Sequence, residues 1–388
     1  MKRLLAVALP ALLLAAACSG EADHVTADTP GVTPTGFVPR LTLVAENVEF
    51  PWGMAALPDG NMLVTEREGR LRILRDGVLD AEPLTGLPGD ILVERQGGLL
   101  DVELHPDFAT NRLVYLTYAQ GTVESNHTTV VRGRLSEDET ALEGVEEIFS
   151  SEVPEKEGGV HFGSRMAFLN DGSLVVTLGD GYRWMDKAQD LTSHFGKIIR
   201  ISDTGEPMPD NPFYDQGGPA RYIWSYGHRN VQGLAYDAER NILYAHEHGP
   251  KGGDELNIIL PGTNYGWPEI TYGVNYDGSI ITTETEAEGM AQPETYWVPS
   301  IAPSGMVLYT GDEYPGWQGD LLIGAMQGPD GRKLVRVDLD ENGQVIGRED
   351  LLEDFQEGFR EVAVGTDGMI YLGTIDIDGK IYRLGVGE

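Results

Sequence analysis

Residues 223–268 bring several groups that could do chemistry into one short stretch. The strings GHRNVQGLAYD and EHGPKGGDELN place His, Arg, Asn, Glu and Asp in turns between apolar runs. Carboxylates beside Gly and Pro carbonyls offer the oxygen ligands that a hard cation prefers, calcium above all. The alternative interpretation is a run of turn-forming residues with surface His and Asp side chains. The residues alone leave both interpretations open.

Four further segments are unusually polar for their apolar surroundings. They are residues 96–100, 161–165, 190–197 and 297–305, and the last three lie directly before apolar runs of strand composition. Binding and catalytic groups gather on loops that a rigid scaffold holds in place. We therefore expect these segments to be functional loops.

The elements that must position these loops are predicted to be β-strands. A turn containing Asp-Gly or a similar pair recurs before apolar runs, as in Pro58-Asp59-Gly60 before 62–64 and Thr366-Asp367-Gly368 before 369–372. Asp-Gly between β-rich runs is a strong hairpin signal. The 50 Gly and 22 Pro favour many short elements, and no long tract of helix-forming residues follows the N-terminal segment. The chain is predicted to be all-β, with strands that include 233–236 and 241–245.

The spacing of these hairpins predicts a propeller. Degenerate repetition of four-stranded units at about 50 residues is typical of this architecture, and ~350 residues would make six or seven blades. The first and last repeats, PDGNMLVTEREGRLRIL and TDGMIYLGTIDIDGKIYRL, look alike. This similarity suits a ring whose two ends share a closing blade.

The polar segments resemble the soluble quinoprotein glucose/sorbosone dehydrogenase family, particularly its bacterial aldose sugar dehydrogenases. The matching strings follow the family order from about residue 41 to the end: QGGLLDVELHPDF, HFGSRMAF, AQDLTSHFGKIIRI with PDNPF, GHRNVQGLAYD, EHGPKGGDELN, GTNYGWP and PSIAPSGM. The resemblance implies a single domain over 41–388, a six-bladed β-propeller with four-stranded antiparallel blades. At its central mouth the family binds pyrroloquinoline quinone (PQQ) over a calcium ion.

The resemblance also implies roles for individual residues. His161 matches the general base that takes the proton from a sugar's anomeric hydroxyl as hydride passes to the quinone. Imidazole suits this role because its pKa, about 6.5 when unperturbed, lies near working pH. Gln96 would hydrogen-bond the sugar, and Arg229 and Asn230 would hold the quinone oxygens, with Arg229 stabilising charge as the cofactor is reduced. Trp297 resembles an aromatic that walls the cofactor plane, with core packing as the alternative.

Two calcium sites follow from the same resemblance. Gly249 and Pro250 would offer backbone carbonyls to the cofactor calcium, which polarises the quinone as a Lewis acid. Glu255 and the Tyr265 carbonyl match a second, structural calcium site.

Two positions depart from the family pattern. The family usually has Leu-Lys-Gly where residues 326–328 read MQG, and Arg-x-Arg-Asp-Val where residues 358–362 read GFREV, so only Arg360 survives. PQQ is a tricarboxylate, and the loss of a charge-assisted contact typically costs about 1.5–3 kcal/mol. The following loop brings two cations, and we expect Arg332 or Lys333 to reach the vacated carboxylate position.

The charge balance excludes some partners. The formal net charge is −34, from 62 acidic and 28 basic side chains. Such a surface repels nucleic acid and anionic lipid head groups, so neither is expected to bind. An anionic ligand would need local basic groups or a bound cation.

The N-terminus, MKRLLAVALPALLLAAACSG, predicts export. Lys2 and Arg3 form a positive segment, an apolar core follows, and three alanines precede Cys18, as in a lipoprotein signal over residues 1–18. The apolar run is too short to span a bilayer. Lipidation of Cys18 would anchor the mature protein at a periplasmic or cell surface; a plain secretory signal is the alternative. Residues 19–40 are predicted to be a flexible tether.

Three functions remain in competition. The leading prediction is an exported PQQ- and calcium-dependent dehydrogenase that oxidises the C1 hydroxyl of an aldose to a lactone and passes electrons to an external acceptor. One alternative is a calcium-dependent propeller hydrolase of the lactonase kind. The other is a non-catalytic, calcium-stabilised binding propeller that has lost PQQ. Each of these could be a monomer or a homodimer.

Overall fold

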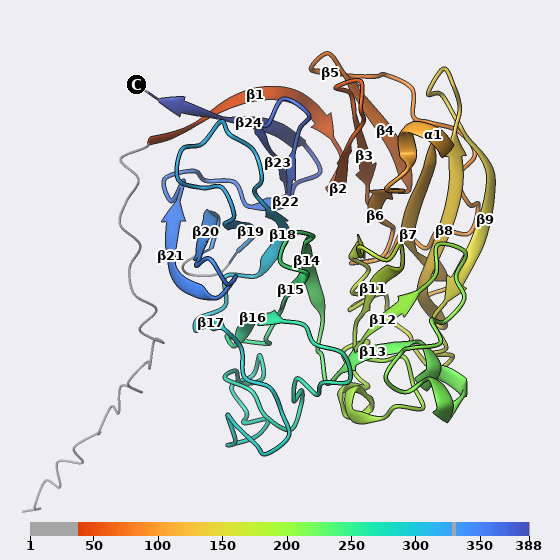
Figure 1. The fold of residues 1–388 in the computed structure, drawn as a ribbon, viewed down its shortest axis with the longest axis vertical. Coiled ribbons are helices and arrows are strands. Elements are labelled where there is room, and N and C mark those ends of the chain that lie inside the picture. The colour runs from red at the N-terminus through yellow and green to blue at the C-terminus, as the bar shows by residue number, and fades with distance from the viewer. Residues whose placement is uncertain (1–37, 328–330, 388) are drawn as a thin grey trace, which may run out of the picture.

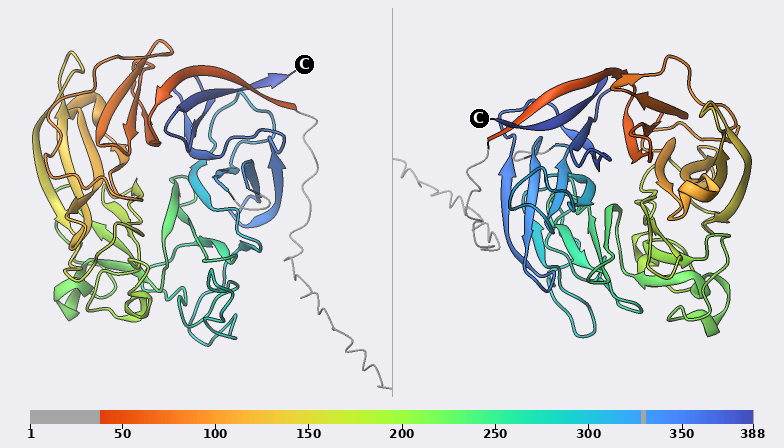
Figure 2. Two further views of the ribbon diagram at one scale, coloured as in Figure 1. Left: turned by 180° about the vertical axis from the view of Figure 1, so that it is seen from behind. Right: turned by 45° about the horizontal axis from the view of Figure 1, so that its top comes forward.

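The chain forms a ring of six blades around a central axis (Figure 1). The computed structural model describes residues 38–327 and 331–387. Each blade is one four-stranded antiparallel sheet, and Figure 2 shows the ring from two further sides. The prediction of an all-β, six-bladed propeller is confirmed. The predicted lipoprotein signal and Cys18 lie outside the described residues.

The strands of each blade follow the sequence from the axis outward. The first blade holds β2 (Pro51–Ala56), β3 (Met62–Glu66), β4 (Arg70–Arg75) and β5 (Val78–Leu79). The second holds β6 (Leu99–Leu104), β7 (Leu113–Gly121), β8 (Asn126–Leu135) and β9 (Leu142–Ser150). The third holds β10 (Met166–Phe168), β11 (Leu174–Leu178), β12 (Lys197–Ile201) and β13 (Ile223–Tyr226). The fourth holds β14 (Val231–Asp237), β15 (Ile242–Glu247), β16 (Asp254–Ile258) and β17 (Thr295–Trp297). The fifth holds β18 (Pro303–Leu308), β19 (Leu321–Ala325), β20 (Leu334–Leu339) and β21 (Val345–Leu351).

The sixth blade closes the ring with strands from both ends of the chain. It holds β22 (Phe359–Val364), β23 (Ile370–Thr374), β24 (Gly379–Gly387) and, at its outer edge, β1 (Val38–Val48). β1 pairs antiparallel with β24 from Val38 opposite Gly387 to Val48 opposite Gly379 (Figure 1). The shared closing blade is therefore as predicted. Residues 38–40, which the sequence analysis places in a tether, already belong to this strand.

The middle strands of the blades are buried on both faces. Every residue of β3, β11, β12 and β19 is buried. Each blade packs between two neighbours, so its inner strands contact side chains on either side. Such strands read as nearly continuous apolar runs, as LLIGA does in β19.

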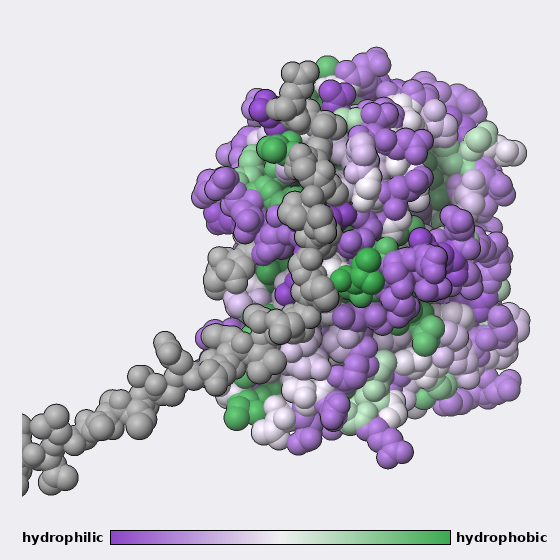
Figure 3. All heavy atoms as spheres, turned by 60° about the vertical axis from the view of Figure 1, so that its left-hand side comes forward, coloured by the Kyte–Doolittle hydropathy of each residue, from purple (hydrophilic) through white to green (hydrophobic). Residues whose placement is uncertain are grey.

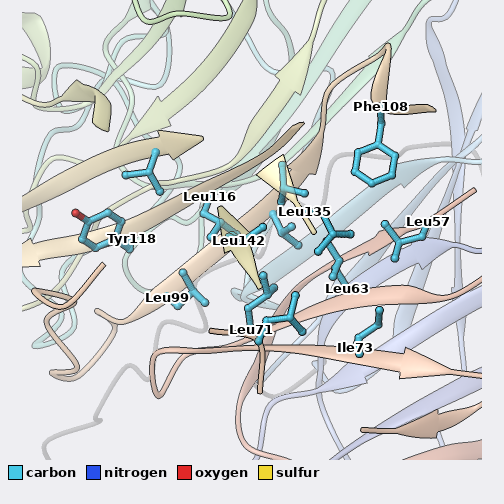
Figure 4. Packing of buried hydrophobic residues seen from close by; sticks show 14 residues of the cluster. Leu57, Leu63, Leu71, Ile73, Leu99, Phe108, Leu116, Tyr118, Leu135 and Leu142 are labelled. Atoms are coloured by element: carbon cyan, nitrogen blue, oxygen red, sulfur yellow. The ribbon is translucent and has the colours of Figure 1, made fainter. Parts of the chain in front are cut away.

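Aliphatic side chains fill the space between neighbouring blades. Between the first and second blades, Leu63 and Leu71 pack in one buried cluster with Leu116 and Leu142 (Figure 4). Truncating one such leucine to alanine typically costs about 2–5 kcal/mol. The packed blades form a rigid scaffold for the loops at their ends.

Helices are few and short in the part of the chain that the structure describes. They are α1 (Phe108–Asn111) and three 3₁₀ turns, η1 (Met185–Gln189), η2 (Tyr214–Gln216) and η3 (Gly218–Tyr222). Within residues 38–327 and 331–387, no helix has the length and hydrophobicity needed to cross a bilayer. The face shown in Figure 3 is mostly hydrophilic, in keeping with the high net charge.

The innermost strands share a local irregularity. The pairing register shifts near the start of β2, β6, β14, β18 and β22. A β-bulge turns the side chain of the extra residue away from the regular alternation of a strand. The residues at these shifts include Trp52, Leu100, Gln232 and Arg360, and all four line one cavity. The irregularity therefore aims side chains from four blades at a common point.

Candidate active site

A cavity of about 240 Å³ lies where the innermost strands of the blades begin. Its lining combines three kinds of group: aromatic rings, side-chain amides and guanidinium groups. The amides Gln96 and Asn230 and the cation Arg360, all expected at the site, lie in this lining. The complete lining is Phe50, Pro51, Trp52, Arg67, Gln96, Leu100, Phe162, Gly163, Asn230, Gln232, His248, Met326, Gln327, Arg360 and Ile375.

A buried ion-pair network lies beside this cavity. Arg165 contacts Asp101 (Nη1 to Oδ1, 3.1 Å) and Glu361 (Nη2 to Oε2, 2.6 Å). The guanidinium carbons of Arg165 and Arg360 lie 4.2 and 4.0 Å from the ring centre of Trp52. Both nearby carboxylates are thus engaged by Arg165, and Arg360 is left without an ion-pair partner among the described residues.

Arg360 therefore lies beside the cavity without a direct ion-pair partner within the described residues, although Glu361 and Asp101 attract it electrostatically. Its Nη2 donates to Gln232 Oε1 (2.9 Å), while Nη1 is buried and has no hydrogen-bond partner within the described residues. Burial, together with the neighbouring charge of Arg165, lowers the pKa of Arg360 well below its usual value. An unpaired buried cation is costly, and an anion in the cavity would offset that cost.

His161 is held by a carboxylate and an amide. Its Nδ1 lies 2.6 Å from Asp180 Oδ1, and its backbone N–H donates to Gln96 Oε1 (2.8 Å). The residue is buried and has a φ of 52°, an uncommon conformation for a residue with a side chain. Burial is the main reason that the pKa of His161 is lowered, and the charge of Arg229 adds to the effect. The imidazole is therefore neutral near pH 7, with Nδ1–H donated to Asp180 and Nε2 available as a base.

Asp180 joins several parts of the site. Burial by itself would raise its pKa, but His161 and Arg229 lower it below the usual value, so the carboxylate stays ionised. Oδ1 also accepts the Tyr182 backbone N–H (2.7 Å), and Oδ2 accepts Trp267 Nε1–H (2.9 Å). One carboxylate thus orients the histidine, a loop and an indole ring.

Arg229 and Asn230 lie in the loop directly before β14, which begins at Val231. Arg229 Nη1 donates to the carbonyls of His248 (2.9 Å) and Gly249 (3.1 Å). Its guanidinium carbon lies 5.4 Å from the Trp267 ring centre. Asn230 Oδ1 accepts the backbone N–H of Gly163 (3.1 Å) and thereby links this loop to the one that carries His161.

A second, very small cavity adjoins Arg229. Its volume of about 10 Å³ suits one water molecule or ion. Gly249, Glu255 and Tyr265, three of the four residues expected to bind calcium, line it together with Glu247, whereas Pro250 does not. Burial raises the pKa of Glu255 to about 8, and the charge of Glu247 contributes. A cation would relieve this repulsion, although no group of three or more His, Cys, Asp or Glu side chains with metal-binding geometry occurs within the described ranges.

Three expected cofactor contacts lie elsewhere. Trp297 packs in the core between the fourth and fifth blades, with the Arg348 guanidinium carbon 5.3 Å from its ring centre, and it does not line the cavity that holds Gln96 and Arg360. Lys333 Nζ pairs with Asp350 Oδ2 (2.6 Å), and Arg332 Nη1 donates to the Gln356 carbonyl (3.0 Å). Neither cation lines the cavity, so the structure does not support the expectation that they replace the missing lysine. Local pairing partners within the fifth blade and the loop before β22 hold them instead.

The two positions that depart from the family pattern, Gln327 and Gly358, have different surroundings. Gln327 lines the cavity, so a longer cationic side chain at this position would face the same space. At Gly358 an added Cβ would lie 2.2 Å from the Met326 carbonyl oxygen. Backbone therefore occupies the space that any side chain at Gly358 would need.

Four residues of the site are absent from the expectations drawn from the sequence. Gln232 lies within the string GHRNVQG, and Asp180 follows the apolar run of β11 closely, so both positions carried a signal. Trp52 is turned into the cavity by a bulge, and Arg67 follows β3 on the first blade. Neither carried a signal, because each becomes part of the site only when the ring closes.

Comparison with known proteins agrees with this fold and site. The chain matches the family model described as Glucose / Sorbosone dehydrogenase over residues 48–383. It is 39% identical over 351 residues to aldose sugar dehydrogenase YliI of Escherichia coli K12, covering 89% of this chain and 92% of the relative. The crystal structure of the soluble aldose sugar dehydrogenase from Escherichia coli in the apo form has a TM-score of 0.83 at 38% identity, covering 90% of this chain and 99% of that one. The PQQ-bound form of aldose sugar dehydrogenase from Streptomyces coelicolor has a TM-score of 0.74 at 30% identity, covering 92% and 100%.

The fold and the cavity define a propeller of the sugar-dehydrogenase type, with its polar site at the end of the ring where the innermost strands begin. The chain belongs to the glucose/sorbosone dehydrogenase family. The resemblance drawn from the sequence motifs is thereby confirmed.

Proposed function

We propose that this protein is an exported, PQQ- and calcium-dependent aldose sugar dehydrogenase that oxidises the C1 hydroxyl of a sugar to a lactone. The observation that carries the proposal is that the His161–Asp180 couple lies beside a cavity lined by the buried guanidinium of Arg360, whose Nη1 has no hydrogen-bond partner within the described residues. A base and an anion site thus adjoin each other, as oxidation of an alcohol with an anionic cofactor requires.

The chemistry of the cavity fits PQQ. A flat aromatic tricarboxylate needs apolar surfaces for its ring and cations for its carboxylates. Trp52 and Phe162 offer the first, and Arg67 and Arg360 offer the second. The carbonyls of Gly249 and Pro250 would hold the cofactor calcium, with Glu255 at the second calcium.

Within this proposal each residue near His161 has a separate task. Asp180 accepts Nδ1–H, so Nε2 of His161 is free to take the proton of the C1 hydroxyl. Gln96 uses its carbonyl oxygen on the His161 amide, which leaves its NH₂ group to donate to the sugar. Arg229 stabilises negative charge that develops beside it. PQQ, when bound, supplies a two-electron acceptor for the hydride that leaves C1.

Export completes the proposal. The N-terminal segment has the order of a lipoprotein signal, and lipidation of Cys18 would tie the propeller to a membrane surface. Labelling with a radioactive fatty acid and fractionation of cells that express the full chain test this anchor. Cys18→Ser should remove the label and release the protein from the membrane fraction.

One observation favours a second function. Gln327 and Gly358 stand where the family has a lysine and an arginine, so two carboxylate contacts are missing. Loss of both would weaken binding by roughly one to three orders of magnitude. A calcium-stabilised binding propeller without the quinone is the function that would remain.

A titration separates these two functions. The protein without residues 1–18 is titrated with PQQ in millimolar calcium while quinone absorbance is followed, and reduction of an artificial dye is then measured with a panel of aldoses. Saturable binding with sugar-dependent dye reduction supports the dehydrogenase, and chelation of calcium should abolish both signals. Absence of binding at high micromolar PQQ would reject the dehydrogenase in favour of the binding propeller.

A further inference from the structure

Lys156 is a buried lysine that forms no ion pair in the part of the chain that the structure describes. It is 2% exposed, and its Nζ makes one hydrogen bond, to Asn126 Oδ1 (2.6 Å). The other two buried lysines of the described residues are compensated, since Lys197 Nζ donates to three backbone carbonyls and Lys333 pairs with a carboxylate. A buried charge without such compensation is costly, and groups of this kind gather at functional sites.

The ammonium of Lys156 lies against a wall of the cavity. Its Nζ is 3.3 Å from the ring centre of Phe162, which is a cation–π contact. Phe162 lines the cavity and directly follows His161 in the chain. A positive charge is therefore fixed on the ring of the residue next to the candidate base.

Backbone contacts hold the loop between β9 and β10, which carries both Lys156 and His161. The Asn126 N–H donates to the Lys156 carbonyl (2.9 Å), and the Gln96 N–H donates to the Gly159 carbonyl (3.0 Å). Gln96 Oε1 in turn accepts the His161 N–H. The second blade thus holds this loop at two points, and the separation between the ammonium and the imidazole is set by the fold.

Opposing charges act on the imidazole of His161. The titratable and charged side chains that face it are Asp180, Tyr182, Arg229, His248 and Lys156. Asp180 favours the protonated imidazole, whereas burial, Arg229 and Lys156 disfavour it and lower the pKa of His161. Burial lowers the pKa of His248 to about 3, so this residue adds no charge near neutral pH.

Lys156 carries its charge in the acid range in which His161 would take up a proton. Burial lowers the pKa of Lys156 to about 7, and the attraction of Asp180 opposes this effect. Lys156 also acts on His127, whose pKa burial lowers, so no anionic group is placed against the ammonium on that side. Asp180 is therefore the carboxylate that Lys156 and His161 share.

From this geometry we propose that Lys156 is a positioning residue of the site, whose ammonium on the ring of Phe162 supplies the positive potential that keeps His161 unprotonated. The inference rests on the proposed function, in which His161 must accept a proton. Lys156 touches neither the sugar nor the base, and it acts through the field that it creates at the imidazole.

The test follows the titration of His161 by NMR in protein that contains ¹³C-labelled histidine and no quinone. Loss of one signal in His161→Gln identifies the resonance. Lys156→Met, which is nearly isosteric and uncharged, should raise the pKa of His161 by about 0.5–1 pH units, as expected for the loss of one charge at roughly 10 Å. Lys156→Gln should give a similar rise, and Lys156→Arg, which keeps the charge, should retain the parent value. If Lys156→Met does not fold, the comparison of the Gln and Arg variants decides.

A matched control removes the same charge from an exposed lysine of a neighbouring turn. Lys187 is 41% exposed and pairs with Glu155, so solvent and salt screen its charge. Lys187→Met should move the pKa of His161 by less than about 0.2 pH units. An unchanged pKa in the two neutral Lys156 variants, an equal rise in Lys156→Arg, or an equal rise in the control would overturn the inference.

The acid limb of kcat/KM should move to higher pH in the neutral Lys156 variants, by the amount found in the titration. If the protein reduces no dye with any aldose, the proposed dehydrogenase is rejected. The titration without quinone still decides whether Lys156 acts on His161, so the two failures are distinguishable.

Discussion

His161 and Asp180 have separate roles in the proposed reaction. His161 is the base, and Asp180 orients its ring and fixes its tautomer. Asp180→Asn keeps a hydrogen-bonding group but removes the charge that favours the Nδ1–H form of His161. We expect kcat to fall by about 10³- to 10⁴-fold, as when a histidine base is held in the wrong tautomer. PQQ affinity, measured by quinone absorbance, should change little, because Asp180 does not line the cavity. A parallel loss of cofactor binding would mean that the substitution disrupts the loop and does not act on the base.

The pH profile of kcat/KM tests the same pair. The neutral imidazole is the active form of a general base, and burial lowers the pKa of His161 below its usual value. The activity should therefore persist as the pH falls through about 6.5 and decline only at lower pH. An acid limb centred above that value would contradict a buried, neutral His161.

Arg67 is a cation of the cavity lining for which the sequence predicted no role. It lines the cavity, its Nε is buried without a hydrogen-bond partner in the described residues, and its contact with Glu68 is loose at 3.6 Å. Arg67→Gln should weaken PQQ binding by about 10- to 100-fold, the loss expected for one charge-assisted contact. The control is a double Arg332→Ala, Lys333→Ala variant, which should bind as the parent does, since both cations have partners elsewhere. The opposite pattern would restore the loop cations as the carboxylate ligands.

At the scale of the elements, the packing of the loop before β22 accounts for Gly358, which stands where the family usually has an arginine. At Gly358 a Cβ would lie 2.2 Å from the Met326 carbonyl oxygen, so the connection between β19 and β20 occupies that space. Gly358→Ala should destabilise the protein by about 1–3 kcal/mol, as overpacking typically does. Thermal unfolding measures the effect, and Gly89→Ala is the control, since a Cβ at Gly89 would meet no atom within 4 Å.

The second departure from the family pattern is Gln327, which stands where the family usually has a lysine. We predict that restoring the lysine strengthens cofactor binding. Gln327 lies in the cavity lining, and Gln327→Lys would add a cation at this position. PQQ affinity should rise by about tenfold, the lower end of the range for a charge-assisted contact. Unchanged affinity would show that no cofactor carboxylate lies within reach of this position.

At the scale of the whole molecule, closure of the ring depends on β1. This strand pairs with β24 along nearly its entire length, so its loss would expose one edge of the sixth blade. Deletion of residues 1–48 should lower Tm strongly or prevent folding, whereas deletion of residues 1–37 should leave Tm unchanged. Circular dichroism during heating compares the two. Equal Tm values would show that the propeller holds together without its closing strand.

Much of the architecture could be predicted because it depends on local patterns. Asp-Gly turns and apolar runs define hairpins through backbone sterics and hydrogen bonding alone, and their repetition along the chain implies a propeller. Of the residues that the motif strings singled out, Gln96 and Asn230 line the cavity, His161 is hydrogen-bonded to Gln96, and Arg229 directly precedes Asn230; their roles stay predictions.

The tertiary structure decided which other side chains line the cavity of the candidate site. Trp52, Gln232 and Arg360 enter the cavity through bulges, and a shift of one residue in register sends a side chain to the opposite face of a strand. The sequence suggested that Lys333 could reach a cofactor carboxylate. In the structure Lys333 pairs with Asp350 on the neighbouring strand. The strands and the propeller ring could be predicted from the sequence because they follow from short-range periodicity, and the motif strings carried the family resemblance. Closure of the ring decided the composition of the site, because only then do residues from distant blades share one volume.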